Sequence, residues 1–306
     1  MPFFARALLV PFAALLAALS FAADAADDAA PLRPALEAAR QDAAVPLALA
    51  VDCNTDSGHR SVQLYPSGVL AWNNERQARI GPTERAALLD ALLEADFASF
   101  EDSYGGKPRA ERTGAPVMVL CRIEVSADEV TKSSYQDVNG ERSERFLALA
   151  GRLLDILAER GAGGVAAASL ADGLDKLTSG ELAVEALALQ LMRLPANRRG
   201  AGVILEVAAG EVSSRAYEPG VAIGEVSPRP LAHEEIQSLV AALNAATVSE
   251  LPARTTAPDI YQLRVQVLQH RLSVHARPPG DGQQADPEGA RLLRLADTLL
   301  TLFPVR

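Results

Sequence analysis

The residues that most often carry chemistry are sparse in this chain, and their spacing matches none of the familiar catalytic motifs. It contains four His and two Cys among 306 residues. His233 and Glu234 begin like a zinc-protease motif, but Gln237 stands where that motif needs a second His. His270 and His275 are five residues apart, which places them on opposite faces of an extended strand. The sequence also lacks a nucleophile elbow and a phosphate-binding loop. We therefore predict no catalytic residue, no metal site and no cofactor.

Oxygen-bearing side chains alternate at Asp52, Asn54 and Asp56 ahead of Gly58, as they do in calcium-binding loops. The twelfth position of such a loop should be Glu, and here it is Gln63. Asn, Asp, Ser and Gly are also the residues of tight turns. A plain turn is the favoured interpretation, and a calcium loop is the alternative.

The two cysteines are predicted to point into the same core. Cys53 continues the alternation of Leu49 and Val51, and Cys121 shares a strand face with Ile123. In an oxidising compartment, two inward cysteines of one domain favour a disulfide. The alternative is a pair of buried free thiols, which pack as small apolar groups.

Composition indicates a folded, acidic protein of one or two domains. Hydrophobic residues make up 49% of the chain and charged residues 22%, which excludes a disordered chain and supplies a core. The formal net charge is −10. Because phosphate recognition needs a basic face, we expect no nucleic-acid partner.

The first 25 residues have the pattern of a secretory signal peptide. Arg6 precedes an apolar run from Ala7 to Ala22, and small residues suited to cleavage follow. The run is shorter than a membrane-spanning helix and contains Pro11. We expect a periplasmic or secreted protein with no stable membrane span after signal removal. Residues 26–45, rich in Ala, Asp and Arg, are expected to form a flexible leader that becomes helical near Leu36–Arg40.

Several sequence blocks recur in the same order along the chain, which predicts a domain duplication. The matched blocks are Tyr65–Val69 with Tyr217–Val221, Ala87–Leu92 with Ser238–Leu243, Val119–Val125 with Tyr261–Val267, and Ala150–Leu154 with Ala296–Leu300. The first strand of each copy is assigned to the alternating apolar residues of 47–51 and of 203–207. Repeat 1 is placed at 46–160 and repeat 2 at 201–306. Residues 161–200 are expected to be a linker with helices over 170–177 and over 181–194.

Each copy is predicted to read strand, strand, strand, helix, strand, strand, helix. Hairpins with helices packed on one sheet face make an α+β domain. The predicted fold is thus α+β, with two tandem homologous domains, each an antiparallel sheet with helices on one face in βββαββα order.

Two groups of side chains are candidates for binding. A loop before the fourth strand of repeat 1 is longer than its counterpart, and binding residues concentrate on such loops. Its aromatic and basic residues are Tyr104, Lys107, Arg109 and Arg112. The second group is Arg122 with Arg264, which occupy matched positions in the two copies and are predicted to point away from the core.

The segment Tyr65–Val69, the helix after it, and the segment Ala95–Tyr104 resemble a family of uncharacterised bacterial envelope domains. Those domains have a glycine-centred hairpin, a helix, and a phenylalanine-and-tyrosine segment before the second hairpin. The resemblance covers the first copy well and the second in outline. The chain lacks the cysteine-rich first hairpin of the family. The resemblance implies this fold and export, and it carries no catalytic residue because the family has no assigned chemistry.

These observations favour an exported, noncatalytic binding protein of the bacterial cell envelope, with another envelope protein as its partner. One alternative is an extracytoplasmic hydrolase whose site forms between the two domains from residues scattered in sequence. The other is an inhibitor or immunity-type protein whose loops block an enzyme. Asp, Glu, Ser and Arg are abundant enough to leave the enzyme alternative open.

Overall fold

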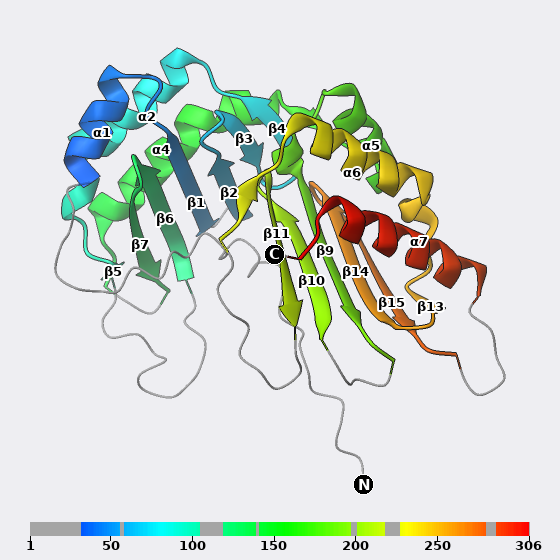
Figure 1. Cartoon of the computed structure of the whole chain (residues 1–306). Helices are drawn as coiled ribbons and strands as arrows, with labels where there is room; N and C mark the ends of the chain where they lie inside the picture. The colour runs from blue at the N-terminus through cyan, green and yellow to red at the C-terminus, as the bar shows by residue number, and fades with distance from the viewer. Residues whose placement is uncertain are drawn as a thin grey trace, which may run out of the picture. The chain divides into compact units, whose positions relative to one another are not determined.

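The chain folds into two β-sheets and a set of helices, as an α+β protein (Figure 1). The computed structural model describes residues 32–55, 58–104, 119–138, 141–196, 201–217, 227–279 and 286–305. These residues belong to one compact unit. The predicted signal peptide lies outside the described residues. No helix in the described part of the chain is long and apolar enough to cross a membrane.

The first sheet has β1 at its centre and runs in the order β5-β7-β6-β1-β2-β3-β4-β8. Neighbouring strands are antiparallel except for β5 and β7, which are parallel. The strands are β1 (Leu47–Thr55), β2 (Gly58–Leu64), β3 (Val69–Trp72), β4 (Arg76–Arg79), β5 (Ser103–Tyr104), β6 (Val119–Ala127), β7 (Val130–Asp137) and β8 (Val165–Ala166).

Three helices bury apolar side chains against this sheet. They are α1 (Leu32–Gln41), α2 (Pro82–Glu94) and α4 (Glu144–Ala162), with the short 3-10 helix η2 (Phe97–Ser99) after α2. Pro82 opens α2, where a missing N–H costs nothing. Ser143 caps α4 by accepting a hydrogen bond from the Phe146 amide. The helix expected near Leu36–Arg40 is confirmed as part of α1. The expectation of flexibility fails for the rest of α1, because Leu32 is buried in the first core.

The second sheet has β9 at its centre and runs in the order β12-β11-β10-β9-β14-β15-β13. Its strands are β9 (Leu187–Leu194), β10 (Gly202–Ala208), β11 (Glu211–Tyr217), β12 (Arg229–Pro230), β13 (Arg254–Thr256), β14 (Ile260–Val267) and β15 (His270–Arg277). Its helices are α5 (Leu170–Ser179), α6 (His233–Ala245) and α7 (Pro287–Leu302), with η3 (Val184–Ala186) and η4 (Val248–Glu250). In the described part of this sheet, β13 and β15 pair in parallel and the other neighbouring strands are antiparallel.

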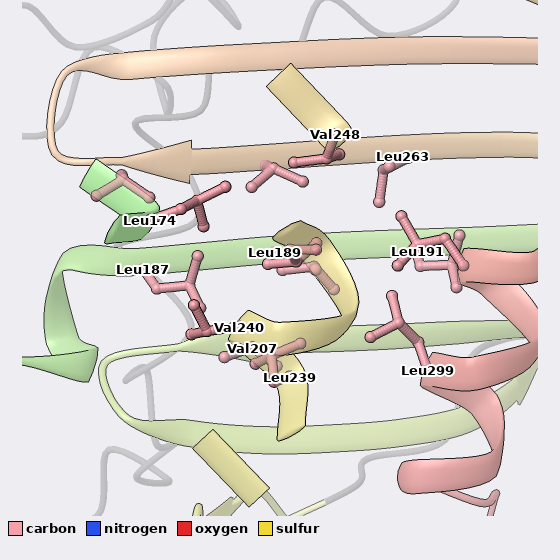
Figure 2. Packing of buried hydrophobic residues seen from close by; sticks show 14 of the residues in the cluster. Leu174, Leu187, Leu189, Leu191, Val207, Leu239, Val240, Val248, Leu263 and Leu299 are labelled. Atoms are coloured by element: carbon pink, nitrogen blue, oxygen red, sulfur yellow. The ribbon is translucent and has the colours of Figure 1, made fainter. Parts of the chain in front are cut away.

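One face of the second sheet packs on its helices to form a continuous apolar core. Figure 2 shows Leu189 and Leu191 of β9 gathered with Leu239 of α6 and Leu299 of α7. All four side chains are fully or almost fully buried. Helices α5, α6 and α7 all bury side chains in this core. The alternate side chains of the strands point to the opposite face, over which the described residues place no helix (Figure 1).

The helix expected over 181–194 is wrong, because residues 187–194 form the central strand β9. Leu187, Leu189 and Leu191 alternate into the core, and β9 pairs with both β10 and β14. Ala, Leu, Gln and Met in this segment favour a helix locally, and the two long-range ladders override that preference. The expected helix over 170–177 is confirmed as α5.

The expected βββαββα order needs correction in both halves of the chain, of which the first runs from α1 to α4 and the second from α5 to α7. Each half begins with a helix (α1 or α5), has a fourth strand before the next helix (β4 or β12), and has a short parallel strand (β5 or β13). β1 is the central strand of the first sheet and β9 is the central strand of the second. The sequence match of residues 47–51 with residues 203–207 therefore pairs β1 with β10 and not with β9. β10, which contains 203–207, occupies the place next to β9 that β2 occupies next to β1.

The two halves meet through backbone and amide hydrogen bonds. β8 adds antiparallel to the outer edge of β4. The buried Gln77 side chain accepts a hydrogen bond from the Ala183 amide at 2.6 Å and donates to the Ala183 carbonyl at 3.4 Å. Asn74 Nδ2 donates to the Leu268 carbonyl at 3.2 Å. These contacts join the edge of the first sheet to the segments around the second.

Candidate binding surface

The predicted disulfide between Cys53 and Cys121 is confirmed. The two residues stand directly opposite each other on β1 and β6, and both are buried in the first core. The bond therefore locks the two central strands of the first sheet together. A disulfide of this kind is typical of an oxidising, extracytoplasmic environment.

The loop residues predicted to bind are only partly described. Tyr104 lies in β5, and its ring packs 5.5 Å from that of Phe146 and 6.2 Å from that of Phe100, measured between centroids. Its hydroxyl accepts a hydrogen bond from the Glu101 amide at 3.2 Å. Tyr104 thus closes an aromatic cluster at the edge of the first core. Lys107, Arg109 and Arg112 lie outside the described residues.

Arg122 lies on the helix-free face of the first sheet, as predicted, and its side chain is half exposed. Its Nη2 atom is 2.5 Å from Glu124 Oε2, and its Nε donates to Ser133 Oγ at 3.1 Å. Close by on this face, His59 Nε2 lies 3.0 Å from Asp52 Oδ1. Charges of both signs therefore alternate on this surface and offset one another.

Arg264 occupies the corresponding face of the second sheet and begins a polar ladder across four strands. Its Nη1 donates to Gln190 Oε1 at 3.3 Å, and Gln190 Nε2 donates to Glu206 Oε1 at 2.8 Å. Arg215 Nη2 donates to the second oxygen of Glu206 at 2.9 Å. Gln262, two residues before Arg264 on β14, accepts from Arg264 Nη2 at 2.7 Å when its amide oxygen faces the guanidinium. These contacts hold the Arg264 side chain against the sheet.

Strand pairing gathers further cationic groups next to Arg264. His275 of β15 stands between Gln262 of β14 and Arg254 of β13. Because β15 alternates, Arg271 and Arg277 share the exposed face with His275. We call this group the basic face. Its members are Arg254, Arg264, Arg271, His275 and Arg277.

The positive charges of the basic face act on His275. Partial burial lowers the pKa of the His275 imidazole below its usual value, and the charges of Arg264, Arg277 and Arg254 lower it further. The imidazole is therefore neutral at pH 7. An anion placed on this face would have the opposite effect on the pKa of His275.

An apolar strip borders the basic face on the same side of the sheet. Ile204 of β10, Met192 and Leu194 of β9 and Ile260 of β14 meet there in register. Ile204 is buried, and the other three are half-buried. The helix-free face thus has an apolar part and a basic part side by side.

The remaining residues with chemical potential are dispersed or serve local structure. The described residues contain no group of three or more His, Cys, Asp or Glu side chains placed to hold a metal ion. The described residues of the segment considered for calcium belong to β1 and β2, where Thr55 pairs with Gly58, and Asp56 lies outside the described residues. His270 Nε2 contacts the Ala167 carbonyl at 2.8 Å, and His233 Nε2 contacts Gln237 Nε2 at 2.9 Å.

Sequence reasoning found one of the five members of the basic face. Arg264 was identified because it matches Arg122, whereas the others have no such match. A usable signal lay in the alternation of Arg271, Ser273, His275 and Arg277, which marks a polar strand face. Arg254 could not be found this way, because it joins the group through the parallel pairing of β13 with β15.

A comparison with protein-family models, with curated proteins and with solved structures finds no match to this chain.

Proposed function

We propose that this chain is an exported, noncatalytic binding protein of the bacterial cell envelope, acting in the periplasm or outside the cell. The observation that carries the proposal is the helix-free face of the second sheet, with the basic face beside an apolar strip. Such a combination of exposed charge and apolar surface on rigid strands suits recognition of another protein. The polar side chains of this face are spread over several strands, and many of them are hydrogen-bonded to one another.

Three further observations support export and the protein's construction. Residues 1–25 have the composition of a signal peptide. The Cys53–Cys121 disulfide suits an oxidising compartment. The two halves share one order of helices and strands around the central strands β1 and β9, which favours a tandem duplication related to the envelope domains that the first copy resembles.

Export is tested by sequencing the N-terminus of the protein recovered from the periplasmic fraction of expressing bacteria. We expect a mature chain that begins within a few residues of Ala25. Recovery of the full-length chain in the cytoplasm alone would contradict the proposal.

Binding without catalysis is tested with the mature protein in two parallel measurements. Chemical crosslinking in intact cells, followed by affinity purification, should give a discrete protein adduct in the envelope fraction. A panel of ester, peptide, glycoside and phosphate substrates should show no turnover. If the protein turns over a panel substrate, and this turnover is lost when acidic or serine residues of the chain are mutated, the protein is a hydrolase and the proposal is wrong.

A further inference from the structure

We propose that the basic face binds an acidic, extended segment of a protein partner. This inference rests on the proposed function and specifies the chemistry of the partner.

The spacing of the cationic groups along β15 matches that of an extended peptide. Arg271, His275 and Arg277 lie at alternate positions of the strand, with Ser273 between them. Alternate residues of a strand are about 6.8 Å apart, and carboxylates at alternate positions of an extended partner repeat at the same distance. A segment lying along β15 would keep its acidic side chains in register with these groups.

Cationic groups flank β15 on both sides. Arg254 of β13 is opposite His275, and Arg264 of β14 is opposite Ser273. An acidic segment along β15 would therefore meet guanidinium groups from three strands. Guanidinium binds carboxylate through two parallel hydrogen bonds, which gives the pairing direction as well as strength.

The charge of this surface is uncompensated in part. Within the ranges that the structure describes, Arg254 and Arg277 form no ion pair. The charges of Arg254, Arg264 and Arg277 also disfavour the protonated form of His275. A bound carboxylate would relieve this repulsion, so the surface is complementary to an anion.

A protein segment suits this surface better than a nucleic acid or a membrane does. None of the five members of the basic face is Phe, Tyr or Trp, the large aromatic side chains on which the bases of single-stranded nucleic acid stack. A membrane would present its negative charge to the whole molecule, whose net charge is −10. An acidic segment instead meets only the basic face, because charges farther away than about 8 Å are screened at physiological salt.

The test measures fluorescence anisotropy of a labelled octapeptide in which Glu alternates with Thr, titrated with the mature full chain. A matched peptide with Gln in place of Glu is the ligand control. We expect binding of the Glu peptide that weakens as salt rises, and no binding of the Gln peptide. The double variant Arg254→Gln/Arg277→Gln should weaken binding about tenfold, because it removes two exposed charge pairs.

Arg294→Gln is the matched protein control, since it removes one arginine charge from an exposed position on α7, on the helical side of the second sheet. It should change the dissociation constant less than twofold. The charge-reversal variant Arg254→Glu/Arg277→Glu should no longer bind the Glu peptide and should bind a peptide in which Lys replaces each Glu. Thermal melts of each variant verify that it is folded.

Three results would overturn the inference: equal binding of the Glu and Gln peptides, equal effects of the basic-face and Arg294 variants, or tighter binding of anionic phospholipid vesicles than of the Glu peptide. Failure here is separable from failure of the proposed function. If an envelope partner is still crosslinked to the Arg254/Arg277 variant, the protein is a binding protein that uses another surface. If the protein turns over a substrate, the proposed binding function itself is wrong.

Discussion

At the residue scale, Cys53 and Cys121 show how far sequence reasoning reaches when it has one geometric rule. Alternation placed both side chains in the core, and the strand register brings them directly opposite each other. Arg264 was placed on the outer face by the same rule. The rule does not identify neighbours, so the convergence of Arg254 and His275 with Arg264 could not be predicted.

The disulfide should contribute a large part of the stability of the first half. It joins residues 68 apart in sequence, and closing a loop of that length stabilises by about 4 kcal/mol in the chain-entropy model. We expect Cys53→Ala/Cys121→Ala to lower the free energy of unfolding by about 2–5 kcal/mol in urea, followed by fluorescence of the single tryptophan, Trp72. Wild type under reducing conditions should behave like the variant, and equal stability with and without reductant would contradict the prediction.

His275 should titrate below the usual histidine pKa of 6.5. Since the folded state holds the proton less tightly than the unfolded state, His275 supports the fold above pH 6.5 and lowers its stability as pH falls below that value. NMR titration of the imidazole should show the low pKa in wild type and a higher pKa in Arg254→Gln.

The control for this titration is His275→Gln, which cannot take up the proton. Between pH 8 and pH 5, wild type should lose more free energy of unfolding than His275→Gln does. Burial of the imidazole is the largest cause of the low pKa of His275, and the charges of Arg264 of β14, Arg277 of β15 and Arg254 of β13 add to it. An equal loss in the two proteins would show that the folded state does not lower the pKa of His275.

At the element scale, β9 marks where local pattern and tertiary pairing disagree. Its Leu187, Leu189 and Leu191 have the period of a strand, while its composition favours a helix. The choice depends on β10 and β14, which follow in sequence and pair with β9 on its two sides. A helix with a strong boundary signal, such as Pro82 at the start of α2, depends less on distant partners because its information is local.

Helix α4 offers a paired test of packing within one element. A Cβ atom added at Gly151 would meet nothing within 4 Å, whereas one added at Gly161 would overlap the Trp72 ring. We expect Gly151→Ala to stabilise the protein by about 0.5–1 kcal/mol, since alanine favours the helix. Gly161→Ala should destabilise it by about 1–3 kcal/mol through overpacking.

The same urea titration with Trp72 fluorescence measures both variants. Gly161→Ala should also shift the emission of folded Trp72, because the added methyl group displaces the ring. Gly151→Ala should leave the emission unchanged. Equal stabilities for the two variants would show that the α4–Trp72 contact is loose.

At the scale of the whole molecule, the two sheets are tied into one unit and carry different outer faces. The first sheet balances Arg122 against Glu124, and the second gathers the basic face on a chain of net charge −10. Both halves have the same order of helices and strands, and they differ in the charges on the helix-free faces of their sheets. Composition alone could not show this, because net charge does not locate its contributors.

The bonds between Gln77 and Ala183 should make the two halves unfold together. Trp72 fluorescence reports the first half and far-ultraviolet circular dichroism reports both, and we expect their urea transitions to coincide. Gln77→Ala leaves a backbone N–H and a carbonyl without their partner and should cost about 1–3 kcal/mol. Gln63→Ala, on the helix-free face of β2, is the matched control and should change stability little. Separate transitions in wild type would show that the halves are independent.

The pairing of β8 with β4 also bears on how the chain is made. A sheet edge with unpaired N–H and carbonyl groups invites pairing with the wrong strand. When the polypeptide emerges with its N-terminus first, β4 appears before α2, β6, β7 and α4. β8 follows α4 directly and pairs with the edge of β4, and every strand of the second sheet comes later in the chain. This order favours covering the edge of the first sheet before strands of the second sheet can pair with it.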